Sequence, residues 1–162
     1  MVPALHLLSP LVNPDGLTGA DATTAGGRVV VRFFLGWLVV RWLIDGMNVI
    51  GTRPDGWWKD RDRAMERLVD LIERWAAAAG DEVTVVFERP PSPPLRSSVI
   101  EVAHAPAPRP HAADDEIVRR LKQLPDRSEV RVVTSDRWLA DQAWALGAAV
   151  LPADSFRSLL ES

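Results

Sequence analysis

The chain has 162 residues, which suits one domain with a hydrophobic core, and its balance of 47% apolar and 25% charged residues is that of an ordinary globular protein. Its formal charge of −3 excludes the global basic field that marks many nucleic-acid binders, although local basic patches remain allowed. The lack of cysteine excludes disulfides, thiolate metal sites and thiol nucleophiles. Since His6, His104 and His111 are the only histidines, we expect any metal to be held by oxygen ligands, which favours Mg²⁺ or Mn²⁺.

The N-terminal part of the chain differs from the rest. Residues 1–27 are rich in Gly, Pro, Thr and Ala without a sustained period, which predicts a disordered tail. The apolar run 28–45 is interrupted by arginines and ends on Asp45, so it fits neither a membrane helix nor a signal peptide. We therefore predict that residues 1–39 are a disordered extension or result from a misassigned start codon, and that the folded domain spans 40–162. Peptide mapping of the native protein would refute a misassigned start by finding residues 1–38.

Strand and helix patterns alternate along the rest of the chain. The long helix has Met65, Leu68, Ile72 and Trp75 on one face, and a loop over 46–61 precedes it. Such alternation predicts an α/β domain with a mainly parallel sheet and helices on both faces. The predicted strands are 41–45, 82–88, 98–105, 129–136 and a short one after 148; the predicted helices are 62–80, 113–124, 137–147 and a last one before 161.

Acidic residues follow several of these strands. Asp45 ends the first strand, Asp136 ends the fourth, and Asp114 or Asp115 begins the helix after the third. Ligands of open parallel sheets bind outside the carboxyl ends of the strands, so these carboxylates can point into one cleft. Crowded like charges must share protons or bind a cation, and a divalent metal held by carboxylates suits phosphoryl chemistry.

Each of these residues also has a purely structural interpretation. Asp114, Asp115 and Asp136 can be helix N-caps, and capping is favoured for either of the first two taken alone. Asn48 can hold a carboxylate or a water in place, or it can be a turn residue. Thr134 and Ser135 can donate hydrogen bonds to the cleft. The functional interpretation therefore depends on the combination of these residues and not on any one of them.

Three segments of the chain carry motifs, "LIDGMNVIG" (43–51), "HAADDEIVRRL" (111–121) and "VRVVTSDRWLADQAWALGA" (130–148). In this order they resemble the motifs of NYN domains, the PIN-like nuclease branch that includes the YacP-like proteins. The first is similar to the opening motif, with Met47 in place of the common Tyr; the second resembles the Ala-Asp-x-x-Ile motif, and the last resembles the third motif. The resemblance implies a three-layer α/β/α PIN-like fold and a metal-dependent ribonuclease that uses Mg²⁺ or Mn²⁺.

The resemblance also assigns residues. It matches Asp45, Asp114 and Asp136 to the catalytic, metal-binding carboxylates and Asn48 to the motif asparagine. Asp114 is preferred to Asp115 because it lies three residues before Ile117. Further candidates are Asp115 as a contributing ligand, Asp141 as an outer ligand, and Glu88 as a residue that lines the cleft or solvates a strand end.

A basic and aromatic loop follows the first strand at the same edge of the sheet. Its basic residues can contact phosphates and its tryptophans can stack on bases. The alternative is that one tryptophan packs into the core and the charges face solvent. Arg137, beside Asp136, can contact a phosphate or pair with a carboxylate. The candidate RNA contacts are Arg53, Trp57, Trp58, Lys59, Arg61, Arg63 and Arg137.

Other classes of protein fit less well. The first strand is not followed by the G-x-G-x-x-G turn of a dinucleotide-binding domain, and Met47 stands where a haloacid-dehalogenase-type phosphatase needs a second acid. The main alternative is a non-catalytic RNA-binding or regulatory module with the same fold. We expect RNA as the partner, with ribosome-associated RNA allowed by the family, no membrane partner and a cytoplasmic location. The oligomeric state is left open, a homodimer included.

Overall fold

The computed structural model describes residues 24–25, 28–29 and 39–162. Thr24–Ala25 (β1) and Arg28–Val29 (β2) pair antiparallel, a feature that the sequence did not predict. Most of the segment 1–39, predicted to be an extension, lies outside the described residues, so that interpretation stays a prediction. Within the described ranges, no helix is both long enough and apolar enough to span a bilayer.

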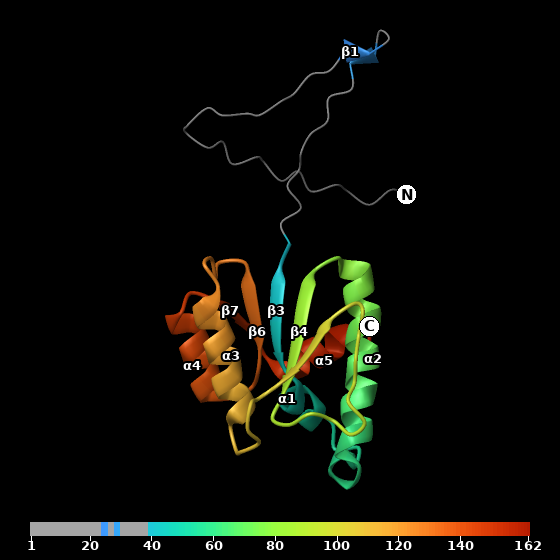
Figure 1. Cartoon of the computed structure of the whole chain (residues 1–162), viewed down its shortest axis with the longest axis vertical. Coiled ribbons are helices and arrows are strands. Elements are labelled where there is room, and N and C mark those ends of the chain that lie inside the picture. The colour runs from blue at the N-terminus through green and yellow to red at the C-terminus, as the bar shows by residue number, and fades with distance from the viewer. Residues whose placement is uncertain (1–23, 26–27, 30–38) are drawn as a thin grey trace, which may run out of the picture. The chain divides into compact units, whose positions relative to one another are not determined.

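The domain is built on a five-stranded sheet in which every neighbouring pair of strands is parallel (Figure 1). The strand order is β5-β4-β3-β6-β7, so the chain starts at the centre, moves to one edge and then continues on the other side. The order reverses between β3 and β6, which is where open α/β sheets bind their ligands. The strands are Arg41–Asp45 (β3), Glu82–Phe87 (β4), Glu101–His104 (β5), Val130–Val133 (β6) and Ala149–Leu151 (β7).

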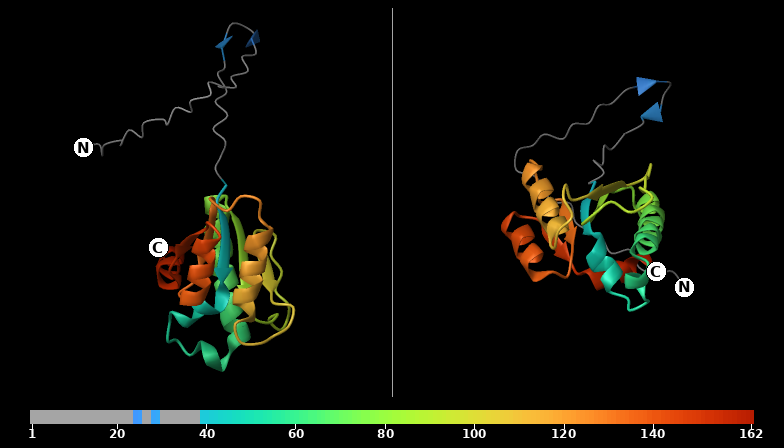
Figure 2. Two further views of the ribbon diagram at one scale, coloured as in Figure 1. Left: turned by 90° about the vertical axis from the view of Figure 1, so that its left-hand side faces the viewer. Right: turned by 60° about the horizontal axis from the view of Figure 1, so that its bottom comes forward.

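Helices cover both faces of this sheet and form the predicted three layers (Figures 1 and 2). Gly46–Gly51 (α1), Arg61–Ala79 (α2) and Ala153–Leu160 (α5) pack on one face, and Ala112–Gln123 (α3) and Arg137–Ala145 (α4) pack on the other. Successive residues of β3 point to opposite faces, so Ile44 joins the core under α2 while Leu43 joins the core under α3. Burial of a strand on both faces explains why 41–45 reads as an apolar run.

The predicted α/β/α architecture is confirmed, with differences at the ends of elements. The prediction of a loop over 46–61 is wrong at its start, because 46–51 form α1, and Trp57–Lys59 form a 3₁₀ turn (η1). The predicted strands 98–105 and 129–136 shorten to 101–104 and 130–133, since their flanking residues enter turns and helix caps. Asp136 therefore lies beyond the end of β6 and caps α4.

The path of α3 brings distant parts of the chain together. Helix α3 follows the edge strand β5 but packs back over β3 and β4 near the centre of the sheet. Its N-terminal turn therefore reaches the carboxyl edge beside the ends of β3 and β6. This crossover places residues near 45, 114 and 136 at one point of the sheet edge.

Candidate metal centre and active-site pocket

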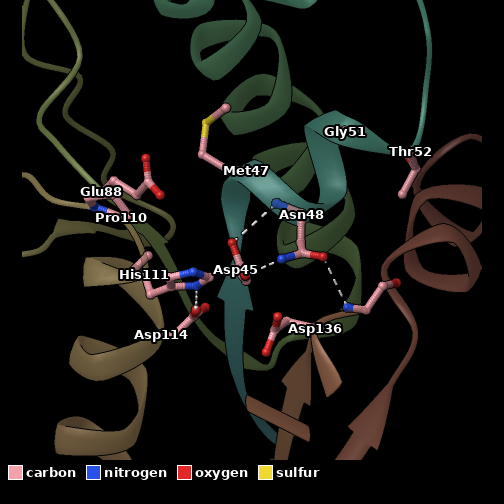
Figure 3. A pocket seen from close by; sticks show the side chains of 12 residues that line it. Asp45, Met47, Asn48, Gly51, Thr52, Glu88, Pro110, His111, Asp114 and Asp136 are labelled. Carbon is pink, nitrogen blue, oxygen red and sulfur yellow. Dashed lines mark hydrogen bonds and ion pairs between the residues drawn. The ribbon is translucent and has the colours of Figure 1, made fainter. Parts of the chain in front are cut away.

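A pocket of about 520 Å³ opens at the carboxyl edge of the sheet, where the strand order reverses (Figure 3). Asp45, Asp114 and Asp136 line it, together with Asn48 and His111. Each carboxylate comes from a different strand–helix unit, so the fold alone brings them together. The sequence-based expectation of one cleft for these three residues agrees with this geometry.

Asp45 is the last residue of β3 and the N-cap of α1. Its Oδ1 accepts a hydrogen bond from the backbone N–H of Asn48 at 3.2 Å, and its Oδ2 accepts one from Asn48 Nδ2 at 2.6 Å. The residue is only 3% exposed. Burial, opposed by the Asn48 hydrogen bonds and reinforced by the charge of Asp114, raises the pKa of Asp45 to about 7.

Asn48 also links two segments of the chain that are far apart in sequence. Its Oδ1 accepts a hydrogen bond from the backbone N–H of Ser135 at 3.2 Å, and Ser135 Oγ in turn accepts one from the N–H of Ala153 at 3.1 Å. Asn48 therefore holds α1 against the β6–α4 connection while it orients Asp45. These contacts agree with the interpretation of Asn48 as a residue that orients a carboxylate. The alternative of a turn residue is wrong, because Asn48 lies within α1.

Asp114 lies in the first turn of α3 and is 5% exposed. The N-cap is His111, whose backbone adopts a left-handed conformation with φ of 61° and whose Nδ1 lies 3.0 Å from Asp114 Oδ2. Burial raises the pKa of Asp114; the hydrogen bond from His111 opposes this shift and the charge of Asp136 adds to it. Asp114 is thus a partner of His111 and not the cap of its helix.

Asp136 both caps α4 and lines the pocket. Its Oδ1 accepts a hydrogen bond from the N–H of Leu139 at 2.9 Å, and its own N–H donates to Thr134 Oγ1 at 3.0 Å. Asp45, Asp114 and Asp136 all lie at or in the first turn of a helix, where the helix dipole favours negative charge. The helix termini thus partly offset the cost of crowding three carboxylates.

The donor set of this pocket fits a divalent cation. His111, Asp114 and Asp136 each offer one ligand atom, and these atoms all lie within 4.8 Å of one another. Asp45 lies close enough to Asp114 for the charge of Asp114 to raise its pKa. A cation placed among these groups would offset their burial and relieve their mutual repulsion, both of which raise the carboxyl pKa values. The expectation of oxygen ligands alone did not anticipate the imidazole of His111.

Two predicted ligands lie outside the pocket. Asp115 forms an ion pair with Arg109, and together they line a separate depression beside α3. Asp141 is exposed on α4 and is not among the residues that line the pocket. Glu88 does line the pocket, and its Oε2 lies 3.5 Å from the guanidinium of Arg61.

The candidate RNA-contacting residues separate into two groups. Trp57 packs against the core and lies under the guanidinium of Arg61 at 5.9 Å, while Arg53 pairs with Glu161 at 2.7 Å. By contrast, Trp58 is 57% exposed and meets Trp57 edge-on, at 6.0 Å between ring centroids. One tryptophan therefore packs and the other faces solvent; the exposed basic candidates are Lys59, Arg63 and Arg137.

His111 is the pocket residue that sequence reasoning missed. A single histidine in a Pro-rich loop does not form a metal-ligand motif. The sequence also does not reveal the left-handed backbone conformation at His111, whose Nδ1 lies beside Asp114. The one available clue was its position three residues before Asp114 at a predicted helix start. Residues at that separation share a face of a helix.

The comparisons agree with this fold and these motifs. A profile of the YacP-like NYN domain matches residues 42–162. A crystal structure of a tryptophan-to-leucine variant of Rae1 (YacP) from Bacillus subtilis is 22% identical and superposes with a TM-score of 0.62 over 76% of each chain. Another crystal structure of Rae1 (YacP) from Bacillus subtilis, also 22% identical, gives a TM-score of 0.57 over 74% of this chain and 72% of the other.

These structures share the PIN-like fold with the present chain. A search of curated proteins finds no match. The profile covers most of the chain, including the three motifs that supply the pocket. The chain therefore belongs to the YacP-like NYN domain family.

Proposed function

We propose that the chain is a metal-dependent ribonuclease that hydrolyses RNA phosphodiester bonds in the pocket formed by Asp45, Asp114 and Asp136. The observation that carries the proposal is the convergence of three carboxylates and His111 at the reversal of the strand order. The family resemblance implies this activity. The pocket supports it with a donor set suited to a divalent cation.

Asp114 and Asp136 would hold the cation, Mg²⁺ or Mn²⁺, with Asp45 beside Asp114 in the same pocket. When bound, such a cation acidifies water and neutralises the charge that develops on a phosphate in the transition state. Asn48 donates to both oxygens of Asp45 and so fixes the orientation of that carboxylate. The backbone N–H of Leu139, which donates to Asp136 Oδ1, fixes one oxygen of Asp136 in the same way.

The loop after α1 would hold the RNA. Trp58 offers an exposed face for stacking on a base, and Lys59, Arg63 and Arg137 are exposed cations for phosphates. Arg53 and Arg61 already face acidic partners, so they would exchange those partners for phosphates on binding. An exposed aromatic ring favours a single-stranded segment, since only unstacked bases can meet it. Ribosome-associated RNA is a prediction from the family resemblance alone. A cytoplasmic location stays a prediction, and the oligomeric state, a homodimer included, stays open.

An RNA cleavage assay tests the proposal. We expect the wild-type protein to cleave RNA with Mn²⁺ or Mg²⁺, EDTA to stop cleavage, and Asp45→Asn to reduce it strongly. Asp141→Asn is the matched control, because it removes an exposed carboxylate of α4 outside the pocket. Cleavage that survives Asp45→Asn unchanged would refute the site. Metal-independent RNA binding without cleavage of any RNA would favour the non-catalytic module.

A further inference from the structure

We propose that His111 is a direct nitrogen ligand of the metal, so that the pocket takes a first-row transition ion such as Mn²⁺ in preference to Mg²⁺. The inference deepens the proposed function, since it rests on the pocket holding a divalent cation. It goes beyond the carboxylate site that the family motifs imply, because His111 lies just before the second motif's Ala-Asp pair and not within it.

The first argument is geometric. The Nδ1 of His111 lies 3.0 Å from Asp114 Oδ2, and the ligand atoms of His111, Asp114 and Asp136 fall within 4.8 Å of one another. The imidazole lines the pocket beside Asp114 and across from Asp45, as Figure 3 shows. The His111 side chain is 74% exposed, whereas that of Asp114 is 8% exposed. The imidazole can therefore adjust to an arriving ion while the carboxylate stays in place.

The second argument concerns the other nearby carboxylate. Both oxygens of Asp45 already accept hydrogen bonds from Asn48, at 3.2 Å and 2.6 Å. The ligand atoms that gather most closely are thus two carboxylate oxygens and one imidazole nitrogen. A neutral nitrogen adds a ligand without adding a negative charge to a pocket that already holds several.

The third argument is chemical. Mg²⁺ demands oxygen ligands in octahedral geometry and keeps several of its waters. Mn²⁺ shares the preference for oxygen ligands, but as a softer transition ion it accepts an imidazole nitrogen more readily than Mg²⁺ does. A site with one nitrogen should therefore bind Mn²⁺ more tightly than the same site without it, and should gain little affinity for Mg²⁺. The competing interpretation is that His111 only donates a hydrogen bond that orients Asp114. In that case its loss affects both metals alike.

Mn²⁺ binding measured by electron paramagnetic resonance distinguishes these interpretations. The variant is His111→Gln, whose amide can still donate a hydrogen bond to Asp114 but lacks an imidazole nitrogen. The matched control is His104→Gln, which changes an exposed histidine of β5 whose Nδ1 lies 3.0 Å from the carbonyl oxygen of Ala105. The readouts are the Mn²⁺ dissociation constant, the Mg²⁺ constant by competition, and the nitrogen modulation of the electron spin echo.

We expect nitrogen modulation in the wild type and in His104→Gln, and its loss in His111→Gln. We also expect His111→Gln to weaken Mn²⁺ binding about tenfold or more and Mg²⁺ binding by less than about threefold. Bound Mn²⁺ without nitrogen modulation in the wild type would overturn the inference. So would equal losses for the two metals in His111→Gln.

The same experiment separates this inference from the proposed function. A wild type that binds Mn²⁺ through nitrogen but cleaves no RNA would overturn the ribonuclease proposal and support the His111 assignment. A wild type that cleaves RNA with Mn²⁺ bound through oxygen alone would support the ribonuclease proposal and overturn the His111 assignment. Absence of Mn²⁺ binding at millimolar concentration would overturn both.

Discussion

Asn48 donates hydrogen bonds to both carboxylate oxygens of Asp45, one from its backbone N–H and one from its side-chain amide. The carbonyl oxygen of the same amide accepts a hydrogen bond from Ser135, beyond the neighbouring strand. One short side chain thus orients a buried carboxylate and joins the two strand ends that flank the pocket. Helix α1, which begins at Gly46, places Asn48 where it can do both.

Replacement of Asn48 should therefore weaken the fold as well as the site. Asn48→Ala leaves Asp45 Oδ2 without its side-chain donor in a buried position, which should lower the free energy of unfolding by about 1–3 kcal/mol. Denaturant unfolding measures this loss. Gln142→Ala, which removes an amide from α4 outside the pocket, should change it by less than about 0.5 kcal/mol. Equal stability of Asn48→Ala and wild type would show that the side-chain hydrogen bonds of Asn48 do not contribute to the free energy of unfolding.

The stability of the metal-free protein should depend on pH through Asp45. Its pKa is raised from an ordinary 3.8 to about 7, so the native state keeps a proton that the unfolded chain releases. The stabilising contribution is complete below about pH 4 and is lost as the pH rises to about 7. The free energy of unfolding should therefore decrease between pH 5 and pH 7 by roughly 1.4 kcal/mol per pH unit for one proton, and thermal unfolding in EDTA should show a falling melting temperature.

Two comparisons check the origin of this pH dependence. Asp45→Asn should make the fall in melting temperature shallower, since Asp114, whose pKa is raised in the same direction, then titrates alone. Added Mn²⁺ should stabilise the wild type more at pH 8 than at pH 5.5, because protons and the cation compete for the carboxylates. A melting temperature that rises from pH 5 to pH 7 in EDTA would contradict the pKa assignment.

Gly46 is required by the close approach of α1 to the sheet. A methyl group at Gly46 would lie 2.6 Å from Cδ1 of Phe87, a fully buried side chain of β4, and closer still to its Cε1. Gly46→Ala should therefore destabilise the protein by about 1–3 kcal/mol. Gly51→Ala, at the other end of the same helix, meets nothing within 4 Å and should be neutral or stabilising by up to about 1 kcal/mol. If both variants unfold alike, the predicted contact with Phe87 is wrong.

Substitutions of the two adjacent tryptophans should have different effects, one on RNA binding and the other on stability. Trp58→Ala removes an exposed ring and should weaken binding of a short fluorescent single-stranded RNA by about 1–3 kcal/mol, or roughly 5- to 150-fold, with little change in melting temperature. Trp57→Ala removes a ring packed against the core and should lower the melting temperature. Fluorescence anisotropy in EDTA measures the binding. Unchanged affinity in Trp58→Ala would remove Trp58 from the RNA-binding surface.

Much of this fold follows from local patterns in the sequence. The apolar run 41–45 and the amphipathic face of Met65, Leu68 and Ile72 predict β3 and α2 because each reflects burial of regularly spaced side chains. The order of the strands cannot be predicted from local patterns, since it depends on which surfaces pack together between residues far apart in the sequence. Alternating strands and helices predict a parallel sheet without stating which strands are neighbours.

The site was predictable only where a residue follows a recognisable element. Asp45 and Asp136 could be placed at the carboxyl edge because each follows an apolar strand. Helix α1 was missed because its six residues are too few for a periodic pattern, and the Asp45-Gly46 pair reads as a turn. The position of His111 depends on a positive φ at a non-glycine residue, which no pattern in the sequence indicates.

Two neighbouring carboxylates allow the most direct test of the central claim, which is that RNA is cleaved in this pocket. Asp114 is buried in the pocket, whereas Asp115 is exposed and pairs with Arg109 outside it. The measurement is the rate of RNA cleavage with Mn²⁺ by Asp114→Asn and by Asp115→Asn. We predict that Asp114→Asn loses about a hundredfold or more and that Asp115→Asn stays within about twofold of the wild type. Equal rates for the two variants, or the larger loss in Asp115→Asn, would contradict the account.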